Sequence, residues 1–173
     1  FIMNQKSIQC IVGDESFLIQ EHVDQLRHQY ADHACEMIET ANLEQLRSLA
    51  TMPSLFHASR FICIKNPWFF FQAISDKELA EIIALLDAIN PDQTKCCFYI
   101  LGKTLDQRKK AVKAIKKAAS FVEYKSYKDW EQGKVMQWIK ERFAKYQINL
   151  TDDALLAFEQ IGGTNLSVLA NEI

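Results

Sequence analysis

Apolar and polar residues along this chain follow two different spacings, one typical of strands and one typical of helices. Four short, largely apolar runs, rich in β-branched and aromatic residues, predict strands. Between them, apolar residues recur every three to four positions, which predicts helices with one buried face. The predicted strands cover residues 7–12, 60–65, 96–101 and 120–124, and the predicted helices cover residues 15–30, 43–49, 75–89 and 103–117.

The strand predicted over residues 96–101 reads CCFYIL and is apolar at every position, as expected for a strand that is covered on both faces. Strands that alternate with helices are most economically joined in a parallel sheet. We therefore expect an α/β domain with a parallel or mostly parallel sheet and helices on both of its faces.

The pattern changes after Tyr124, because no further strand is predicted there. We expect a helix over about residues 129–146 and a second helix that Thr151 caps, since a threonine hydroxyl can accept from the first amides of a helix. The pair Gly162-Gly163 ends that helix, because glycine readily adopts the left-handed conformation of a helix C-terminus. Asn165 can then cap a third helix.

These patterns predict two domains. Residues 1–126 form the sheet domain, and residues 127–173 form a small helical domain. The last helix reaches Ile173 with its apolar period still running. We therefore expect the natural chain to continue beyond this residue.

The composition is that of an ordinary globular protein, with 49% hydrophobic and 24% charged residues. No run approaches the roughly 18 consecutive apolar residues of a membrane span, and glycine and proline are few, so membrane-spanning, collagen-like and disordered classes are excluded. The five cysteines are an odd number, and we recognise no signal peptide before them. We therefore expect reduced thiols in a cytosol, serving as small core residues.

The net charge of −2 is small but unevenly distributed. Residues 103–117 hold seven basic side chains and a single acidic one, Asp106. Val112 and Ile115 interrupt the charges at helical spacing, which predicts an amphipathic helix with a cationic outer face. That face could contact DNA or another subunit, or it could simply be solvated. The residues concerned are Arg108, Lys109, Lys110, Lys113, Lys116 and Lys117.

The tripeptide Gly102-Lys103-Thr104 has the ending of a phosphate-binding loop. Such a loop needs another glycine five positions before its second glycine, where this chain has Cys97 inside an apolar strand. At the first strand-to-helix turn, Gly13 is followed by Asp14 and Glu15, whose carboxylates would repel phosphates. We therefore expect no nucleotide cofactor. Histidine and cysteine spacings predict no metal site, and no catalytic constellation stands out.

A short apolar cluster, Met52-Pro53-Ser54-Leu55-Phe56, lies between a predicted helix and a predicted strand. Connecting segments that expose large apolar groups commonly bind a partner. Alternatively, Leu55 and Phe56 plug the bottom of the sheet domain. A second apolar run, PWFFF at residues 67–71, is expected to be buried.

Several blocks of the sequence, taken in their order and spacing, resemble the delta subunit family of the bacterial DNA polymerase III clamp loader. The similarity spans essentially the whole chain. The blocks are CIVGDESFLIQEHV at residues 10–23, MPSLFHASRFICIKN at 52–66, GKTLDQRKKAVKAIKK at 102–117, WIKERFAKYQINLTDDALLAFEQIGG at 138–163 and NLSVLANEI at 165–173.

The resemblance implies a sheet domain of the AAA+ type without a working phosphate loop, followed by a helical lid. A collar domain normally follows in the family and would be absent from this chain. The implied function is that of a non-catalytic subunit that binds the sliding clamp and opens one of its interfaces, so that primed DNA can enter during replication. Any nucleotidyl transfer would belong to other subunits of the polymerase holoenzyme.

In the family, an apolar wedge between the second helix and the second strand binds the clamp. By this resemblance the wedge falls on Met52, Leu55 and Phe56, and the Leu-Phe pair inserts into the clamp pocket. Pro53-Ser54 departs from the family pattern, so whether Met52 belongs to the clamp-binding wedge is left open. Ser167 stands where the family often carries arginine, which weakens any expected polar contact there.

The resemblance also implies further partners: the beta subunit as the clamp, the gamma/tau and delta-prime subunits, and primed DNA within the assembled complex. It implies no cofactor, no membrane and a location in the bacterial cytoplasm, with the nucleoid-associated replication machinery. Two alternatives remain. One is another AAA+-type loader subunit, delta-prime-like or ATP-hydrolysing, although its zinc-binding cysteines, phosphate loop or Ser-Arg-Cys finger are missing from the sequence. The other is an enzyme with an unrecognised site.

Overall fold

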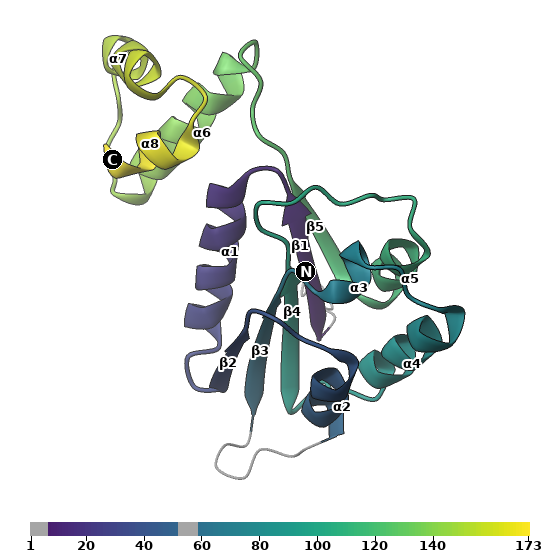
Figure 1. The fold of residues 1–173 in the computed structure, drawn as a ribbon. Helices are drawn as coiled ribbons and strands as arrows, with labels where there is room; N and C mark the ends of the chain where they lie inside the picture. The colour runs from purple at the N-terminus through teal and green to yellow at the C-terminus, as the bar shows by residue number, and fades with distance from the viewer. Residues whose placement is uncertain (1–6, 52–58) are drawn as a thin grey trace. The chain divides into compact units, whose positions relative to one another are not determined.

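The computed structural model describes residues 7–51 and 59–173 of the chain (Figure 1). The chain divides into two compact units, Phe1–Tyr124 and Lys125–Ile173, and each is described here by itself. The first unit contains the sheet, and the second is built from helices.

Unit 1 is organised around a sheet in which five strands of the described chain run parallel, in the order β2-β3-β4-β1-β5. The first strand of the chain is thus near one side of the sheet, between the fourth and the fifth. Cys10 of β1 lies opposite Phe98 of β4 on one side and Phe121 of β5 on the other. The strands are β1 (Ile8–Gly13), β2 (Ala34–Ile38), β3 (Arg60–Lys65), β4 (Thr94–Tyr99) and β5 (Ser120–Tyr124).

The parallel sheet is confirmed, but the prediction of four strands is wrong because β2 was missed. This strand reads ACEMI, lies at one edge of the sheet and pairs with β3. Its residues alternate between partly buried and exposed, and Glu36 stands in its middle. An edge strand of this kind lacks the continuous apolar run that marks β3 and β4.

One face of the sheet is covered by helix α1 (Ser16–Gln29) (Figure 1). Its buried residues Ile19, Val23 and Leu26 pack into one apolar cluster with β-strand residues such as Ile11 and Phe61. The helix predicted over residues 15–30 is therefore confirmed.

Four helices cover the opposite face (Figure 1). The apolar cluster on this side includes Leu46, Ile82, Leu86, Val112 and Ile115, which come from three different helices. These residues fall at the apolar positions that predicted the helices. The four are α2 (Leu43–Thr51), α3 (Trp68–Phe71), α4 (Asp76–Asp87) and α5 (Lys110–Ala118).

Two details on this face differ from the sequence analysis or extend it. The PWFFF run forms α3, and the predicted burial is confirmed for Phe69 and Phe70. The basic helix begins at Lys110 rather than at residue 103. Its start is delayed because the Asp106 carboxylate accepts a hydrogen bond from the backbone amide of Arg108 at 2.9 Å and so stabilises a turn.

Unit 2 consists of helices α6 (Gln132–Lys145), α7 (Asp152–Gly162) and α8 (Leu166–Asn171). The predicted caps are confirmed: the Thr151 hydroxyl accepts from the Ala154 amide at 3.3 Å, and the Asn165 side chain accepts from the Ser167 amide at 3.1 Å. Gly163 has φ of +54°, in the left-handed region that favours glycine. In the described ranges, none of the helices combines the length and the apolar character that crossing a membrane requires.

Candidate functional site

The turn between β1 and α1 is the first place to look for a nucleotide, because helix N-termini that follow a parallel strand often bind phosphates. Here Gly13, at the end of β1, pairs with Tyr124 at the end of β5. The Tyr124 carbonyl oxygen accepts from the amide of Asp14 at 3.1 Å and from the amide of Glu15 at 3.4 Å. The amides of this turn therefore already have a protein acceptor.

The amide of Phe17, in the first turn of α1, also has an acceptor. The carboxylate of Glu15 accepts from the backbone amide of Phe17 at 3.0 Å, so α1 is capped by a negatively charged side chain. A phosphate placed here would have to displace both this carboxylate and the Tyr124 carbonyl. The geometry of the turn thus disfavours an anionic ligand more strongly than the two acidic residues in the sequence indicated.

Tyr124 is held to α1 by its side chain as well. Its hydroxyl lies 3.0 Å from Nδ1 of His22, and the two rings meet edge to face with centroids 5.8 Å apart. Burial lowers the pKa of His22 and raises the pKa of Tyr124, so both groups favour their neutral forms. The last residue of unit 1 is therefore fixed by its carbonyl group and by its hydroxyl.

The apparent phosphate-loop ending, Gly102-Lys103-Thr104, lies after β4. Cys97 is fully buried inside that strand, as the sequence analysis expected of this apolar run. Lys103 places its ammonium group 4.8 Å from the centroid of the Phe71 ring, in a cation–π contact. The tripeptide is therefore part of a loop that follows a buried strand, and the next helix, α5, begins only at Lys110.

The predicted wedge residues Met52, Leu55 and Phe56 lie outside the described residues. The segment is bounded by the end of α2 at Thr51 on one side and by Ser59 on the other. What the structure describes is how these two ends are anchored.

Arg60, at the start of β3, anchors both ends. Its guanidinium Nη2 donates to the carbonyl oxygen of Leu49, in the last turn of α2, at 2.7 Å. Its backbone amide donates to Gln93 at 2.7 Å, and the neighbouring Ser59 carbonyl accepts from Ala34 at 3.0 Å. Arg60 is 9% exposed. Its side chain therefore fixes the distance between the helix and the strand from which the segment emerges.

These contacts lie at the amino ends of β2, β3 and β4, whereas the β1–α1 turn lies at the carboxyl end of β1. Because all strands run parallel, the described residues that flank the predicted wedge segment lie at the amino-terminal ends of the strands, and the β1–α1 turn lies at the carboxyl-terminal ends. Sequence analysis missed the role of Arg60. The signal in the sequence was a charged residue at the start of the strand RFICIK, directly before four apolar residues.

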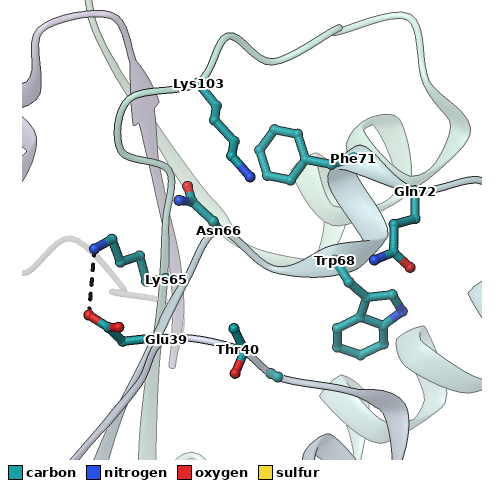
Figure 2. A pocket seen from close by; sticks show the side chains of 9 residues that line it. Glu39, Thr40, Lys65, Asn66, Trp68, Phe71, Gln72 and Lys103 are labelled. Atoms are coloured by element: carbon teal, nitrogen blue, oxygen red, sulfur yellow. Dashed lines mark ion pairs between the residues drawn. The ribbon is translucent and has the colours of Figure 1, made fainter.

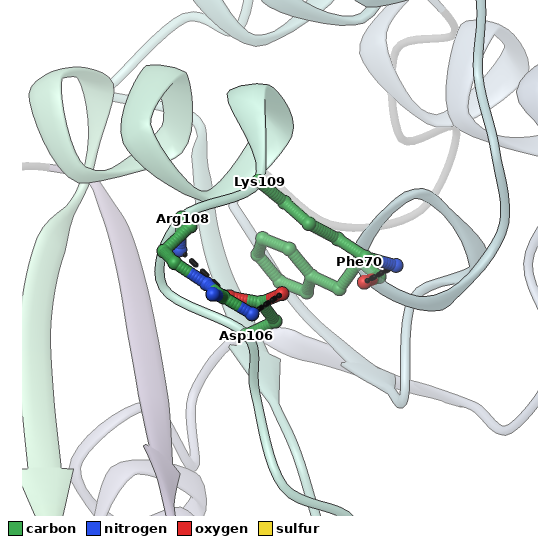
Figure 3. Close-up of polar contacts among 4 residues, drawn as sticks. All are labelled: Phe70, Asp106, Arg108 and Lys109. Atoms are coloured by element: carbon green, nitrogen blue, oxygen red, sulfur yellow. Dashed lines mark hydrogen bonds and ion pairs between the residues drawn. The ribbon is translucent and has the colours of Figure 1, made fainter.

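The basic residues of the segment 103–117 do not converge on one site. Arg108 pairs with Asp106, with its Nε 3.1 Å from the carboxylate, and this contact lowers the pKa of Asp106. Lys109 donates to the carbonyl oxygen of Phe70 at 3.0 Å (Figure 3) and to that of Phe71, also at 3.0 Å. Lys109 is therefore a structural residue that ties the start of α5 to α3.

The remaining basic residues lie along α5. Lys110 forms an exposed ion pair with Asp76 at 2.9 Å. Lys116 donates to Gln107 and lies 4.6 Å from the centroid of the Phe121 ring. Lys113 and Lys117 are exposed. The cationic face predicted for this helix therefore exists on the later turns of α5, while its first residues bind neighbouring parts of unit 1.

The cysteines are core residues with one exception. Cys10, Cys63, Cys96 and Cys97 are buried, and Cys35 on the edge strand β2 is exposed. Burial raises the pKa of the Cys10 thiol to about 12, so this thiol remains protonated near neutral pH. Within residues 7–51 and 59–173, no three histidine, cysteine, aspartate or glutamate side chains gather closely enough to hold a metal ion.

The order of the five strands, the helices on both faces and the following group of helices define an AAA+-like α/β domain with C-terminal helices. The same fold is found in the solved structure of the Bacillus subtilis DNA clamp loader delta protein, with a TM-score of 0.71 and 21% sequence identity. That match covers 97% of this chain and 52% of the solved chain.

The sequence comparisons identify the family. Residues 10–125 match the family described as DNA polymerase III, delta subunit. The DNA polymerase III subunit delta of Bacillus subtilis (strain 168) is 27% identical over 128 residues, which cover 68% of this chain and 37% of that protein. The chain therefore belongs to the DNA polymerase III delta subunit family, and it spans about half or less of the length of these relatives.

Proposed function

We propose that this protein is a clamp-opening subunit: it binds a sliding clamp and opens one of the clamp interfaces so that primed DNA can enter. Membership of the DNA polymerase III delta subunit family supports this role. The observation that carries the proposal concerns the described residues on either side of the Leu55-Phe56 pair: Arg60 ties the last turn of α2 to the start of β3, at the amino-terminal ends of the strands.

The physical basis of clamp binding is an apolar anchor. An adjacent leucine and phenylalanine can fill one apolar pocket, and each buried side chain contributes on the order of 1.5 to 3 kcal/mol. Met52 adds to the anchor if Pro53 allows it. The hydrogen bond between Arg60 and Leu49 holds the described residues on both sides of the leucine-phenylalanine pair together before binding. Preorganisation of this kind lowers the entropic cost of binding.

The protein acts without hydrolysing ATP in this proposal. The closed β1–α1 turn supports this part, because the Tyr124 carbonyl and the Glu15 carboxylate accept from the amides that would otherwise bind phosphates. Energy for clamp loading would then come from other subunits of the loader, of the gamma/tau and delta-prime kinds. The site of action would be the bacterial cytoplasm, in the replication machinery.

The exposed basic side chains of α5 suit a contact with DNA phosphates or with an acidic face of another subunit. Lys113, Lys116 and Lys117, which are exposed on the later turns of α5, carry this part of the proposal. Such contacts would be independent of DNA sequence and would weaken with salt.

Co-purification tests the proposed function directly. The full-length protein is mixed with the sliding clamp of its own organism and the mixture is separated by size. We expect the two proteins to elute together, and an opened clamp interface should allow the clamp to leave a circular DNA on which it was loaded. Separate elution at concentrations well above micromolar, with both proteins folded, would contradict the proposal.

A further inference from the structure

Two hollows at the carboxyl edge of the sheet lie outside the features discussed so far. The first has a volume of about 430 Å³ and lies among the ends of β2 and β3, the short helix α3 and Lys103 (Figure 2). The second has a volume of about 420 Å³ and lies between α3 and the start of α5. Phe71 and Gln72 line both hollows, so the two adjoin each other.

The hollows lie on the side of the sheet where ligands of open α/β folds bind, outside the carboxyl ends of the strands. They lie near β2 and β3 rather than at the switch in strand order beside β1. The crevice beside β1 is closed by Tyr124, whereas the hollows near β2 and β3 remain open. Asn66 gives the first hollow a rigid wall, because its side chain accepts from the Leu101 amide at 2.9 Å and donates to the Leu101 carbonyl at 3.2 Å.

Cationic side chains stand at both ends of this track. Lys65 lies 3.6 Å from Glu39, whose side chain is 81% exposed, and Lys110 pairs with Asp76 on the surface. Lys103 contacts the Phe71 ring, and in the described part of the chain no carboxylate lies within ion-pair distance of it. Exposed pairs of this kind are weak, so these ammonium groups can exchange their partners for a phosphate at little cost.

The rings of Trp68 and Phe71 line the first hollow, and Lys103 lies beside the Phe71 ring (Figure 2). The indole nitrogen of Trp68 donates to Glu78 at 3.1 Å, which fixes the plane of the ring. Trp68 and Phe71 are both partly exposed. A ligand ring that stacks on Phe71 would displace the Lys103 ammonium group from the face of Phe71. The ammonium group would then lie beside the groups attached to the ligand ring.

We propose that these two hollows form a track for single-stranded DNA. Bases stack on Trp68 and Phe71, and their phosphates contact Lys65, Lys103 and Lys110. Aromatic rings beside ammonium groups suit a strand of nucleotides, because base stacking together with phosphate contacts gives binding without sequence preference. An acidic peptide would satisfy the lysines but not the rings. The inference rests on the proposed function in one respect: the strand would be the single-stranded part of primed DNA.

Fluorescence anisotropy with a labelled oligothymidylate of about ten nucleotides tests the proposal on the full-length protein. Lys103→Gln should weaken binding at low salt by about threefold or more and reduce the slope of log affinity against log salt by about 0.7. Phe71→Leu keeps an apolar side chain but removes the stacking surface. It should weaken binding roughly fivefold or more while leaving the salt slope unchanged.

The matched control is Lys95→Gln, which removes the same charge from the amino end of β4, at the opposite edge of the sheet. It should leave binding unchanged. Equal losses in Lys95→Gln and Lys103→Gln, no loss in Phe71→Leu, or tighter binding of an acidic peptide than of the oligonucleotide would each overturn the proposal. The same variants should bind the sliding clamp as the unmodified protein does. Measuring clamp binding and oligonucleotide binding separately therefore distinguishes a failure of the proposed function from a failure of the DNA track. Lys103 is exposed, which ensures that at least this variant folds.

Discussion

Gly13 and Tyr124 approach each other so closely that a Cβ atom on Gly13 would stand 1.7 Å from the Tyr124 carbonyl oxygen. The same oxygen accepts hydrogen bonds from the two amides that follow Gly13. This contact joins the first and last strands of the sheet and closes the turn that would bind a nucleotide in a related fold.

We predict that Gly13→Ala destabilises the protein. The Cβ atom would collide with the backbone of Tyr124, and the φ of +136° at Gly13 is one that other residues rarely adopt. Strain and overpacking together are expected to cost about 3 kcal/mol or more of the free energy of unfolding. Urea unfolding followed by circular dichroism measures this loss.

Gly102→Ala is the control for this experiment. Gly102 also has a positive φ, +70°, but no atom lies within 4 Å of the position that its Cβ would take. It should therefore show the conformational cost without the collision, about 1 kcal/mol. Equal effects of the two substitutions would show that the close approach to Tyr124 is unimportant.

A second prediction is that ATP does not bind. The Tyr124 carbonyl and the Glu15 carboxylate occupy the amides of the β1–α1 turn, and a triphosphate would meet the negative charges of Asp14 and Glu15. Calorimetry with ATP and magnesium should give no heat beyond dilution. A dissociation constant in the low micromolar range, about −8 kcal/mol, would contradict the prediction.

Much of the fold could be predicted from the sequence, because most elements carry a strong local pattern. The strands β3 and β4 are almost continuously apolar, and α4 is capped by Ser75, whose hydroxyl accepts from the Glu78 amide at 3.1 Å. The edge strand β2 has no such pattern. Its pairing with β3 is decided by the rest of the sheet, which a local pattern does not contain.

A third prediction concerns Arg60, which ties the end of α2 to the start of β3. Arg60→Met keeps an apolar stem but leaves the Leu49 carbonyl without this donor, and a lost charged hydrogen bond of this kind costs about 1.5 to 3 kcal/mol. We expect lower stability and, at a temperature where the variant is folded, weaker clamp binding. Both are measured on the same sample by thermal unfolding and by surface plasmon resonance.

Arg47→Met provides the comparison. Arg47 belongs to α2, the helix that Arg60 contacts, and forms an exposed ion pair with Glu81 of α4. Exposed ion pairs contribute little to the free energy of unfolding. We expect its unfolding midpoint and clamp affinity to match those of the unmodified protein. Unchanged clamp affinity in folded Arg60→Met would show that Arg60 does not position the segment.

A fourth prediction is a dependence of stability on pH through His22. Burial lowers the pKa of this histidine in the folded protein, so the unfolded chain takes up the proton first as pH falls below about 6.5. Stability due to the neutral ring is therefore complete above that pH and is lost as pH falls toward the lowered pKa.

The measurement is the urea midpoint at several pH values between neutral and acidic conditions, for the unmodified protein and for His22→Gln. Glutamine is polar but does not titrate in this range, so the variant should lose less stability on acidification. Parallel curves for the two proteins would mean that the environment of His22 has no influence on folding.

The site was less predictable than the fold, since its contacts join residues that are far apart in the chain. The acidic residues after Gly13 indicated a turn without a phosphate, but the role of the Tyr124 carbonyl depends on the pairing of β1 with β5. Likewise, seven basic residues in one segment predicted a single cationic face. Arg108, Lys109 and Lys110 instead bind Asp106, the carbonyl groups of α3 and Asp76. Of these partners only Asp106 is close in the sequence, so a local pattern does not contain the other two.

The double variant Leu55→Ala with Phe56→Ala tests the central claim. Truncating two anchor side chains of an interface should lower clamp affinity by about a hundredfold or more. The unfolding midpoint should stay unchanged, because we propose that the pair binds the clamp rather than filling the core, where its loss would cost several kcal/mol. Leu156→Ala, which truncates an exposed leucine of α7, should change neither quantity.

The most direct measurement is therefore the dissociation constant for the sliding clamp, determined for the double variant next to its unfolding midpoint. Our account predicts that clamp binding is lost while the midpoint is that of the unmodified protein. Unchanged clamp binding by the folded double variant would contradict the account.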